Sequence, residues 1–296
     1  MISTLKHLSY ILRTDIDVLQ NIIQNIDAYY YSFKKEKINK DTGEPLFDKD
    51  GSIKTREVNA TKKELKQIQK RIYKLLASLV KLPDYVFGGV PKHDNILNAK
   101  YHQGNKYVFT TDLKSFFPSI SHTQVFNVFI EYGFSPTVSR ILTQLITYKY
   151  QVPQGVPTST FIANLVFKKT GDKISEFAQI NNIKFSIFVD DITLSSKVDF
   201  KDKIPYILDI LKNDGYKISY QKTFYKTKNP IITGVICQNN LIKLPNNTYK
   251  RLKKYHLKQQ DDKNFVDKFN GLKLYKERVK STNTSPKESQ RNNYKN

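Results

Sequence analysis

Residues 184–196 read KFSIFVDDITLSS, a stretch in which the adjacent carboxylates of Asp190 and Asp191 lie between two apolar runs. The aromatic and β-branched residues on either side predict two strands, Lys184–Val189 and Ile192–Ser196, joined by a tight turn at the two aspartates. Two like charges in an apolar hairpin repel each other unless a cation compensates them. Aspartate is also common in turns, and Asp261-Asp262 repeats the dipeptide without apolar flanks, so the pair alone favours an ordinary turn.

A third carboxylate, Asp112, has a comparable place at the end of the apolar segment Tyr107–Leu113, which also predicts a strand. No His or Cys stands beside the three aspartates. Carboxylates of this kind offer hard oxygen ligands, which suit Mg²⁺ or Mn²⁺ better than Zn²⁺. Compensation by a divalent metal is therefore the functional interpretation of the three residues.

The composition excludes several classes of protein. The 296 residues are 39% hydrophobic and include 19 Tyr and 18 Phe, which is typical of a folded globular chain with a sizeable core. No run approaches the roughly 18–20 apolar residues that span a bilayer, and the first residues lack the pattern of a secretory signal. One cysteine, Cys237, cannot form an internal disulfide and fits a reducing compartment, so we expect a cytoplasmic protein.

The charge indicates a polyanionic partner. The chain has 49 Lys and Arg against 27 Asp and Glu, a formal net charge of +22. Such an excess favours nucleic acid binding, because Lys and Arg displace counterions from phosphates. Biased gene composition is the alternative explanation, although it would not by itself suppress acidic residues.

Apolar periodicity predicts a mixed α/β body followed by a small basic helical segment. A basic β-hairpin is expected from strands Tyr29–Phe33 and Ser52–Val58, and a helix capped by Thr61 is expected to run from Thr61 to Leu82. The other expected elements are one or two helices within 2–28, helices His122–Tyr132, Pro136–Tyr148, Ser159–Ala178 and Lys203–Asn213, strands near Lys217–Ser219 and Ile231–Cys237, and basic helices after Leu241 with a polar tail at Ser281–Asn296.

Several segments occur in a characteristic order along the chain: DLKSFFPSI at 112–120, QGVPTS at 154–159 and FVDD at 188–191. They resemble motifs A, B and C of a reverse transcriptase palm. Gly215–Thr223 resembles motif D, and Ile232-Thr233-Gly234 resembles the turn at the base of the thumb. Asn98-Ala99-Lys100-Tyr101-His102 matches the Asn-Ala-x-x-His signature of bacterial retron reverse transcriptases, whose Val-Thr-Gly is close to residues 232–234.

The resemblance implies an α/β (α+β) right-hand polymerase with fingers, palm and a short helical thumb. The expected divisions are an N-terminal helical segment at 1–30, fingers with the retron-like region at 31–105, a palm with an interleaved fingers segment at 106–238, and the thumb with its tail at 239–296. The implied activity is that of an RNA-directed DNA polymerase, which makes cDNA from a bound structured non-coding RNA and deoxynucleoside triphosphates. The resemblance further implies a role in antiviral defence, an effector protein as a partner, and no membrane partner.

The resemblance also assigns the metal ligands. Asp112 and Asp190 are expected to bridge two Mg²⁺ ions, with Mn²⁺ as a substitute, and Asp191 is expected to assist near the primer end. The backbone carbonyl of Leu113 is a further expected ligand. Two such ions suit nucleotidyl transfer, because together they activate the primer hydroxyl and neutralise the leaving pyrophosphate.

Phe117 is expected to select the sugar of the incoming nucleotide. It stands five residues after Asp112, where such enzymes place an aromatic ring against the sugar 2′ position. A bulky ring there excludes a ribonucleotide, so the product should be DNA. The alternative is an ordinary core ring beside Phe116.

Four more residues are expected to contact the nucleotide. Gln154 and Gly155 fit the motif B position, where an amide and a permissive backbone approach the substrate. Arg56 fits the fingers, where cations meet the triphosphate or template phosphates, although any single lysine of the following helix has a solvated face as its simpler interpretation. Lys222 is expected either to protonate the leaving pyrophosphate or to face a phosphate.

The segment Asn98–His102 belongs to a region that the resemblance assigns to holding the cognate RNA. Stacking and phosphate contacts suit such recognition. His102 has a second interpretation as a satisfied structural residue, the commoner fate of a lone histidine. The residues expected to bind RNA are Asn98, Lys100, Tyr101, His102, Lys106, Thr233, Gly234, Lys253 and Lys254.

Two features depart from typical retron enzymes. Phe188-Val189 stands where these enzymes have Tyr-Ala, which keeps the ring and loses its hydroxyl, and the expected thumb is short. Related defence reverse transcriptases outside the retrons share the palm, so an enzyme that makes untemplated or protein-primed DNA is one alternative. The other is a catalytically silent or trigger-dependent RNA-binding scaffold of a defence complex, against which the three intact aspartates argue.

Overall fold

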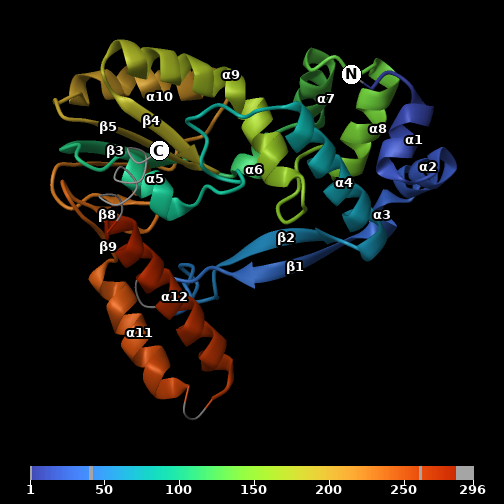
Figure 1. Ribbon diagram of the computed structural model, residues 1–296. Coiled ribbons are helices and arrows are strands. Elements are labelled where there is room, and N and C mark those ends of the chain that lie inside the picture. Colours follow the sequence, from blue (N-terminus) through green and yellow to red (C-terminus); the bar gives the residue numbers. More distant parts are fainter. Residues whose placement is uncertain (1, 40–42, 260–261, 285–296) are drawn as a thin grey trace, which may run out of the picture.

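The computed structural model describes residues 2–39, 43–259 and 262–284. At its centre lies a four-stranded antiparallel sheet with the strand order β4-β5-β3-β6 (Figure 1). The strands are β3 (Tyr107–Asp112), β4 (Lys184–Phe188), β5 (Asp191–Ser196) and β6 (Phe224–Lys226). β4 and β5 form the predicted hairpin, and β3 is the predicted strand that ends at Asp112.

The fourth strand differs from the prediction. The segment expected as a strand near Lys217–Ser219 makes only an isolated bridge between Ile218 and Leu113, and the edge strand is β6 instead. β6 is three residues long, and both of its end residues are exposed, so it carries no apolar alternation that a sequence pattern could report.

Helices cover both faces of this sheet (Figure 1). α9 (Ser159–Ile180) and α10 (Ile204–Asn213) lie on one face, and the short α5 (Asn95–Tyr101) lies on the other. α9 is buried along most of its length because apolar residues recur on several of its faces, as expected for a helix inside the core. α5 is a helix that the apolar periodicity does not predict.

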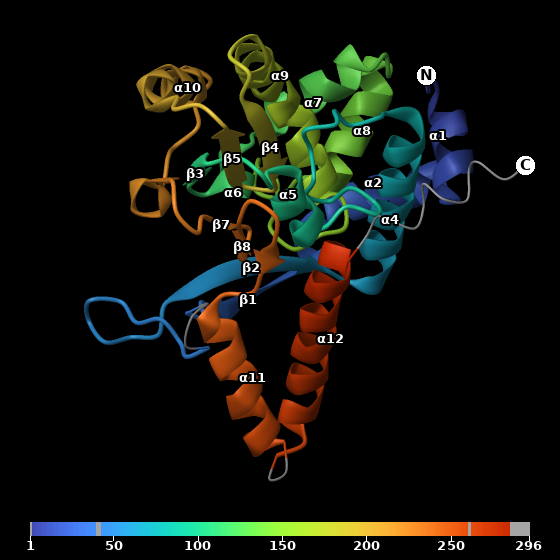
Figure 2. The same ribbon diagram turned by 60° about the vertical axis from the view of Figure 1, so that its left-hand side comes forward.

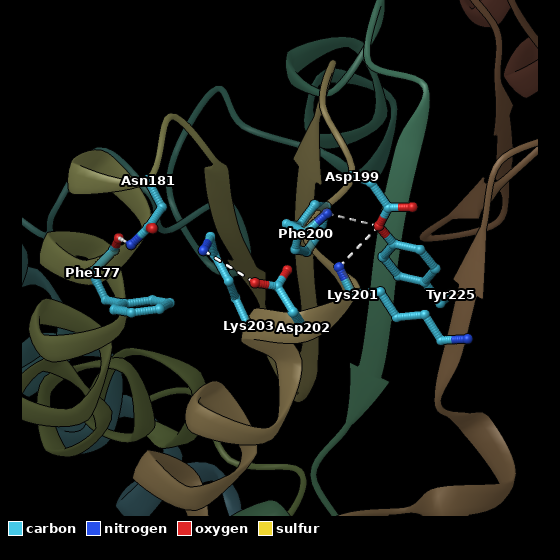
Figure 3. Close-up of polar contacts among 8 residues, drawn as sticks. All are labelled: Phe177, Asn181, Asp199, Phe200, Lys201, Asp202, Lys203 and Tyr225. Carbon is cyan, nitrogen blue, oxygen red and sulfur yellow. Dashed lines mark hydrogen bonds and ion pairs between the residues drawn. The ribbon is translucent and has the colours of Figure 1, made fainter.

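The loop from β5 to α10 is fastened to the edge strand β6 (Figure 3). Tyr225 of β6 donates its hydroxyl proton to Asp199 with an Oη–Oδ1 distance of 2.7 Å, and the backbone N–H of Lys201 donates to the same oxygen at 3.0 Å. These two hydrogen bonds lower the pKa of Asp199. They hold the 3₁₀ helix η1 (Lys201–Lys203), and with it the start of α10, beside the sheet.

A second, helical layer packs beside the sheet. It contains α1 (Leu5–Leu12), α2 (Ile16–Gln24), α3 (Ile26–Tyr29), α4 (Lys63–Leu79), α6 (Phe116–Ser119), α7 (His122–Glu131) and α8 (Pro136–Ile146). Three short helices therefore stand where one or two were expected. The expected cap of α4 is wrong, because Thr61 ends the preceding strand and its hydroxyl donates to Oε1 of Gln69 at 3.0 Å.

The predicted basic hairpin is formed by β1 (Tyr30–Glu36) and β2 (Thr55–Thr61), which pair antiparallel. Its base is anchored in the helical layer, where buried Tyr30 stacks on Tyr148 with ring centroids 4.1 Å apart. The rest of β1 is exposed. The hairpin therefore projects from the body toward the C-terminal helices (Figure 1).

The C-terminal part consists of a small sheet and two long helices. The elements are β7 (Ile231–Ile232), β8 (Val235–Cys237), β9 (Ile242–Lys243), α11 (Asn246–Lys258) and α12 (Asn264–Thr284). The two helices extend away from the body as a pair (Figure 2). The expected basic helices are thus present, whereas most of the expected polar tail, residues 285–296, lies outside the described residues.

Within the part of the chain that the structure describes, buried apolar residues form two separate clusters. The larger joins the helical layer to the face of the central sheet that α9 covers. The smaller joins α5 to the β7–β9 sheet and α12, through Ile96, Ala99, Val108, Ile232, Val235, Cys237, Ile242, Leu244 and Val279. The β7–β9 sheet and α12 are therefore rooted on α5 rather than on the main core. Within the described ranges, no helix has the length and apolar character needed to cross a bilayer.

Candidate functional site

The three aspartates meet where β3 ends and β5 begins. Asp112 is paired with Asp191 across the two strands, and the backbone N–H of Leu113 donates to the carbonyl of Asp190 at 2.9 Å. Each aspartate offers one carboxylate oxygen, and the three oxygens lie within 4.8 Å of one another. Asp112 is buried, and the other two are half-buried. The fold therefore brings Asp112 together with Asp190 and Asp191, which lie 78 and 79 residues further along the chain.

The turn that presents Asp190 has an unusual backbone conformation. Val189 has a φ of +61°, which is unfavourable for a β-branched residue. Gly88 lies directly behind it, and a Cβ on Gly88 would be 2.4 Å from the Val189 backbone nitrogen. The neighbouring Phe87 donates its N–H to the carbonyl of Ile187 at 2.9 Å. Glycine at position 88 lets this segment approach closely enough to support the strained turn.

Lys222 supplies positive charge to the aspartates. It ends the 3₁₀ helix η2 (Tyr220–Lys222), and its Nζ lies 2.8 Å from Oδ2 of Asp112. Partial burial by itself would lower the pKa of Lys222, but the hydrogen bond to Asp112 and the nearby charges of Asp190 and Asp191 raise it. The ammonium group is therefore protonated at neutral pH.

The donor set fits a divalent metal. Asp112, Asp190 and Asp191 offer three clustered carboxylate oxygens, the hard ligands that Mg²⁺ and Mn²⁺ prefer. Lys222 brings one positive charge to three carboxylates, so the ionised cluster retains negative charge that a metal would neutralise. These three aspartates are the residues that would hold it.

Phe116 and Phe117 of α6 have different environments. Phe116 is only 3% exposed and lies in the main core, with its ring 6.1 Å from that of Phe167. Phe117 is half-buried and only borders the same core. Phe117 is therefore partly accessible to a ligand, as a sugar-contacting residue requires.

Gln154 and Gly155 lie against the outer edge of β2. The N–H of Asn59 donates to the carbonyl of Gln154 at 2.9 Å. Gly155 has a φ of +119°, and a Cβ there would be 2.7 Å from Cγ1 of Val58. Both the backbone conformation and the close contact require glycine. The predicted nucleotide-binding loop is thus fixed to the hairpin that carries Arg56.

Two basic surfaces border the hairpin. Arg56 is exposed on β2 directly opposite Lys35, a pairing of like charges that destabilises a hairpin. At the base of the hairpin lies a pocket of about 450 Å³, here called the lysine pocket, which is lined by Tyr31, Thr61, Lys62, Lys63, Lys66, Gln67 and Lys70. The sequence signal for this pocket is the spacing of lysines by four residues along α4.

The structure contradicts two of the expected RNA contacts. Asn98 and His102 are both 0% exposed, because α5 packs them against the underside of the central sheet, and RNA cannot reach them there. Burial lowers the pKa of His102 to about 3, so its ring is neutral. His102 is therefore a satisfied structural residue, in agreement with its second interpretation.

The other expected RNA contacts have accessible groups. Tyr101 is 39% exposed, and Nζ of Lys184 lies 5.1 Å from the centre of its ring. Lys106, Lys253 and Gly234 are exposed, whereas Lys100, Thr233 and Lys254 are half-buried. Lys254 makes an ion pair with Glu44, which follows the first strand of the hairpin.

Comparison with known proteins identifies the family. The family described as "Reverse transcriptase (RNA-dependent DNA polymerase)" matches residues 34–237. The chain is 28% identical over 262 residues to the Retron Ec86 reverse transcriptase of Escherichia coli, an alignment that covers 86% of this chain and 77% of that protein. It is 32% identical over 203 residues to the Retron Se72 reverse transcriptase of Salmonella heidelberg, covering 68% of this chain and 50% of that protein.

A third relative, the Retron Ec48 reverse transcriptase of Escherichia coli, is 32% identical over 205 residues, which is 63% of this chain and 49% of that protein. The chain thus spans about half the length of the Se72 and Ec48 enzymes. The family match extends over well more than half of this chain and includes every part of the aspartate cluster. This chain therefore belongs to the reverse transcriptase family, and within it to the retron type.

Proposed function

We propose that this chain is an active polymerase that copies a bound structured non-coding RNA into cDNA. The observation that carries the proposal is the cluster of Asp112, Asp190 and Asp191 beside the protonated Lys222. Holding three carboxylates together costs free energy, because like charges repel. A silent RNA-binding scaffold has no use for such a cluster.

The proposed metal is Mg²⁺, as two ions, with Mn²⁺ as a substitute. When the ions are bound by Asp112, Asp190 and Asp191, with the Leu113 carbonyl as a proposed further ligand, they supply activation of the primer hydroxyl and neutralisation of the pyrophosphate. Lys222 holds a proton at Nζ at neutral pH, which suits both of its predicted roles: donation to the leaving pyrophosphate and contact with a phosphate.

The proposed substrates are deoxynucleoside triphosphates. Phe117 has a partly accessible ring for the sugar. Gln154 and Gly155 follow Phe117 in the chain order of motifs A and B, and the Asn59 N–H holds their loop to β2. The unfavourable opposition of Arg56 and Lys35 supports an anionic ligand at this point of the hairpin, such as the triphosphate or a template phosphate.

We further propose the division into fingers, palm and thumb. The palm is the central sheet with its covering helices, the fingers are the hairpin with the helical layer, and the thumb is the β7–β9 sheet with α11 and α12. The expected boundary at residue 105 needs one refinement, because α5 packs on the palm and the thumb rather than on the fingers.

RNA is expected on accessible groups of the fingers, palm and thumb. These are the lysine pocket and, from the sequence expectation, Lys100, Tyr101, Lys106, Thr233, Gly234, Lys253 and Lys254. Lysines near an aromatic ring suit single-stranded or looped RNA, since they combine phosphate contacts with stacking. A cytoplasmic setting, an effector partner and a role in antiviral defence complete the proposal, and the buried free thiol of Cys237 supports a reducing compartment.

The test is to purify the protein from its own operon and sequence the RNA and DNA that copurify with it. Wild type is compared with the double variant Asp190→Ala, Asp191→Ala. We expect one discrete RNA with both proteins, and DNA complementary to that RNA only with wild type. A matched control is Asp202→Ala with Asp209→Ala, which removes two aspartates that pair with surface lysines and should leave the cDNA unchanged.

Three other outcomes contradict parts of the proposal. Continued DNA synthesis by the Asp190, Asp191 variant would refute the assignment of the metal ligands. RNA without DNA in wild type would favour the binding scaffold or a trigger-dependent enzyme. DNA unrelated to the bound RNA would favour untemplated or protein-primed synthesis.

A further inference from the structure

A chain of buried hydrogen bonds runs along the underside of the palm, opposite α9. Ser186 of β4 and Ser195 of β5 are both 0% exposed, and both belong to the hairpin that ends in Asp190 and Asp191. His102 bridges them, with Nε2 2.7 Å from Oγ of Ser186 and Nδ1 2.7 Å from Oγ of Ser195. One histidine side chain thus joins both strands of the catalytic hairpin to the end of α5.

The partners of the two serines fix the direction of these bonds. Ser186 donates its hydroxyl proton to Oδ1 of Asn98 at 2.7 Å, so it accepts from His102, and the ring proton lies on Nε2. Nδ1 then accepts from Ser195, whose oxygen in turn accepts from Nδ2 of Asn105 at 2.7 Å. The neutral ring has one donor and one acceptor, and both are satisfied.

The same chain continues into the thumb. Nδ2 of Asn98 donates to Oγ1 of Thr233 at 3.4 Å, and Thr233 donates to the carbonyl of Asn95 at 2.9 Å. Nδ2 of Asn95 donates back to the Thr233 carbonyl at 2.9 Å and to the hydroxyl of Tyr275, on α12, at 2.6 Å. A continuous path of hydrogen bonds therefore links the catalytic hairpin to the turn and to the long helix of the thumb.

Thr233 has a strained backbone conformation at its place in this path. It has a φ of +46° in the two-residue turn between β7 and β8, and Gly234 follows at +89°. Positive φ is unfavourable for a β-branched residue, and such a conformation persists only when surrounding contacts fix it. The contacts with Asn95 and Asn98 are the ones that hold the Thr233 side chain and carbonyl.

We propose that Asn98, His102 and Thr233 are positioning residues that fix the angle of the thumb relative to the hairpin carrying Asp190 and Asp191. Apolar contacts in the smaller core cluster hold the thumb on α5, but such contacts are not directional. A polar network that is buried at its palm end and part-buried at the thumb is directional, and it specifies one arrangement. The inference rests on the proposed function for its consequence, which is that the angle sets how firmly the enzyme holds the primer and template.

The first test breaks the path at a residue that cannot touch RNA. In Ser186→Ala we expect the Kd for primer and template to rise about tenfold and the products to become shorter. The rate of single-nucleotide addition at saturating primer and template should change less than about twofold. Ser139→Ala is the matched control, because Ser139 is equally buried in α8 and its hydroxyl has no hydrogen-bond partner in the structure.

A second pair of variants covers the case in which Ser186→Ala fails to fold. Thr233→Val keeps the branched shape and removes the hydroxyl, whereas Thr233→Ser keeps the hydroxyl. We expect Thr233→Val to weaken binding of primer and template as Ser186→Ala does, and Thr233→Ser to restore it. A thumb held only by apolar packing would give the reverse order, because valine retains more apolar surface than serine.

A distance measurement tests the angle without any catalysis. Spin labels are attached at Asp267→Cys on α12 and Val198→Cys in the palm, and the native Cys237 is 5% exposed and so escapes labelling. We expect broader distance distributions in Ser186→Ala and Thr233→Val, and the parental distribution in Ser139→Ala and Thr233→Ser. Unchanged distributions in the first two variants would overturn the inference. If these two variants broaden the distributions but wild type makes no DNA, the result would count only against the proposed function.

Discussion

At the scale of single residues, two neighbouring phenylalanines illustrate how position separates core from site. Phe116 fills the palm interior, while Phe117 exposes part of its ring at the edge of the same core. A ring that packs on the core and remains partly exposed is suited to reject a bulky group by contact. This arrangement is the physical basis for expecting Phe117 to discriminate between sugars.

Phe117→Ala should therefore admit ribonucleotides. We expect the ratio of ribonucleotide to deoxyribonucleotide incorporation to rise at least about tenfold, because the steric exclusion of the 2′-hydroxyl is lost. The measurement is single-nucleotide primer extension with each triphosphate in turn. Phe116→Ala is the control: it should lower the free energy of unfolding by about 3–5 kcal/mol without changing the ratio. An unchanged ratio in Phe117→Ala would assign this ring to the core alone.

His102 gives a prediction about pH. Its pKa is about 3 in the folded protein because of burial, and about 6.5 in the unfolded chain. Between these values the unfolded state binds the extra proton, so stability is fully present above about pH 6.5 and falls by about 1.4 kcal/mol per pH unit below it from this group alone. Urea unfolding at pH 7.5 and pH 5 measures the slope.

The comparison for that slope is His102→Gln. This variant should be less stable than wild type at pH 7.5 but should lose less stability on going to pH 5, since glutamine does not titrate. His7→Gln removes an exposed histidine from α1 and should leave the slope unchanged. Equal slopes in wild type and His102→Gln would show that His102 does not carry the effect.

At the scale of elements, the loop that contains Gly155 connects the fingers to the active site. In Gly155→Ala a Cβ would meet Val58 at 2.7 Å in a backbone conformation with φ +119°. We expect the hairpin to shift and primer extension to fall at least about tenfold, since substrate positioning is sensitive to small displacements. The matched variant in the same steady-state extension assay is Gly215→Ala, because Gly215 has a φ of +88° but no atom within 4 Å of its Cβ position. This variant separates the effect of backbone strain from the effect of the contact with Val58. Equal losses in both variants would mean that backbone strain, and not the contact with β2, is responsible.

The elements also show what the sequence can predict. The strands that carry Asp112, Asp190 and Asp191 have local apolar patterns, so their hairpin and the triad were accessible to pattern reasoning. The helix α5 cannot be predicted from such a local pattern, because it is seven residues long and faces the palm with polar Asn98. The partners that justify burial of His102 lie 84 and 93 residues away along the chain. No local pattern reports such partners, so the sequence leaves both interpretations of His102 open, and only the resemblance assigns the segment to RNA.

At the scale of the whole molecule, the hairpin of the fingers and the thumb touch. Lys254 of α11 forms an ion pair with Glu44, and a Cβ on the neighbouring Gly43 would be 3.3 Å from the Tyr255 hydroxyl. The hydrogen bond from Lys254 lowers the pKa of Glu44. Figure 2 shows the hairpin passing below the palm toward the upper end of α11. Fingers, palm and thumb thus form a closed path in which this exposed ion pair is one link.

Opening this link should speed the loading of RNA. Both side chains are substantially exposed, so the pair adds little to stability and is weakened by salt. In Glu44→Gln we expect the association rate of a structured RNA to rise about two- to threefold at low salt, with the difference vanishing at high salt and little change in thermal stability. Stopped-flow fluorescence with a labelled RNA hairpin measures the rate.

The control must separate loss of the contact from gain of net positive charge, which by itself accelerates association with RNA. Glu36→Gln changes the net charge by the same amount at the exposed end of β1, where the ion pair with the thumb is not involved. If Glu36→Gln accelerates loading as much as Glu44→Gln does, the effect is long-range electrostatics and the contact is not a barrier. If only Glu44→Gln accelerates it, the closed path of the free enzyme limits entry. Lys254→Gln should then also accelerate loading, even though it removes a positive charge that attracts RNA.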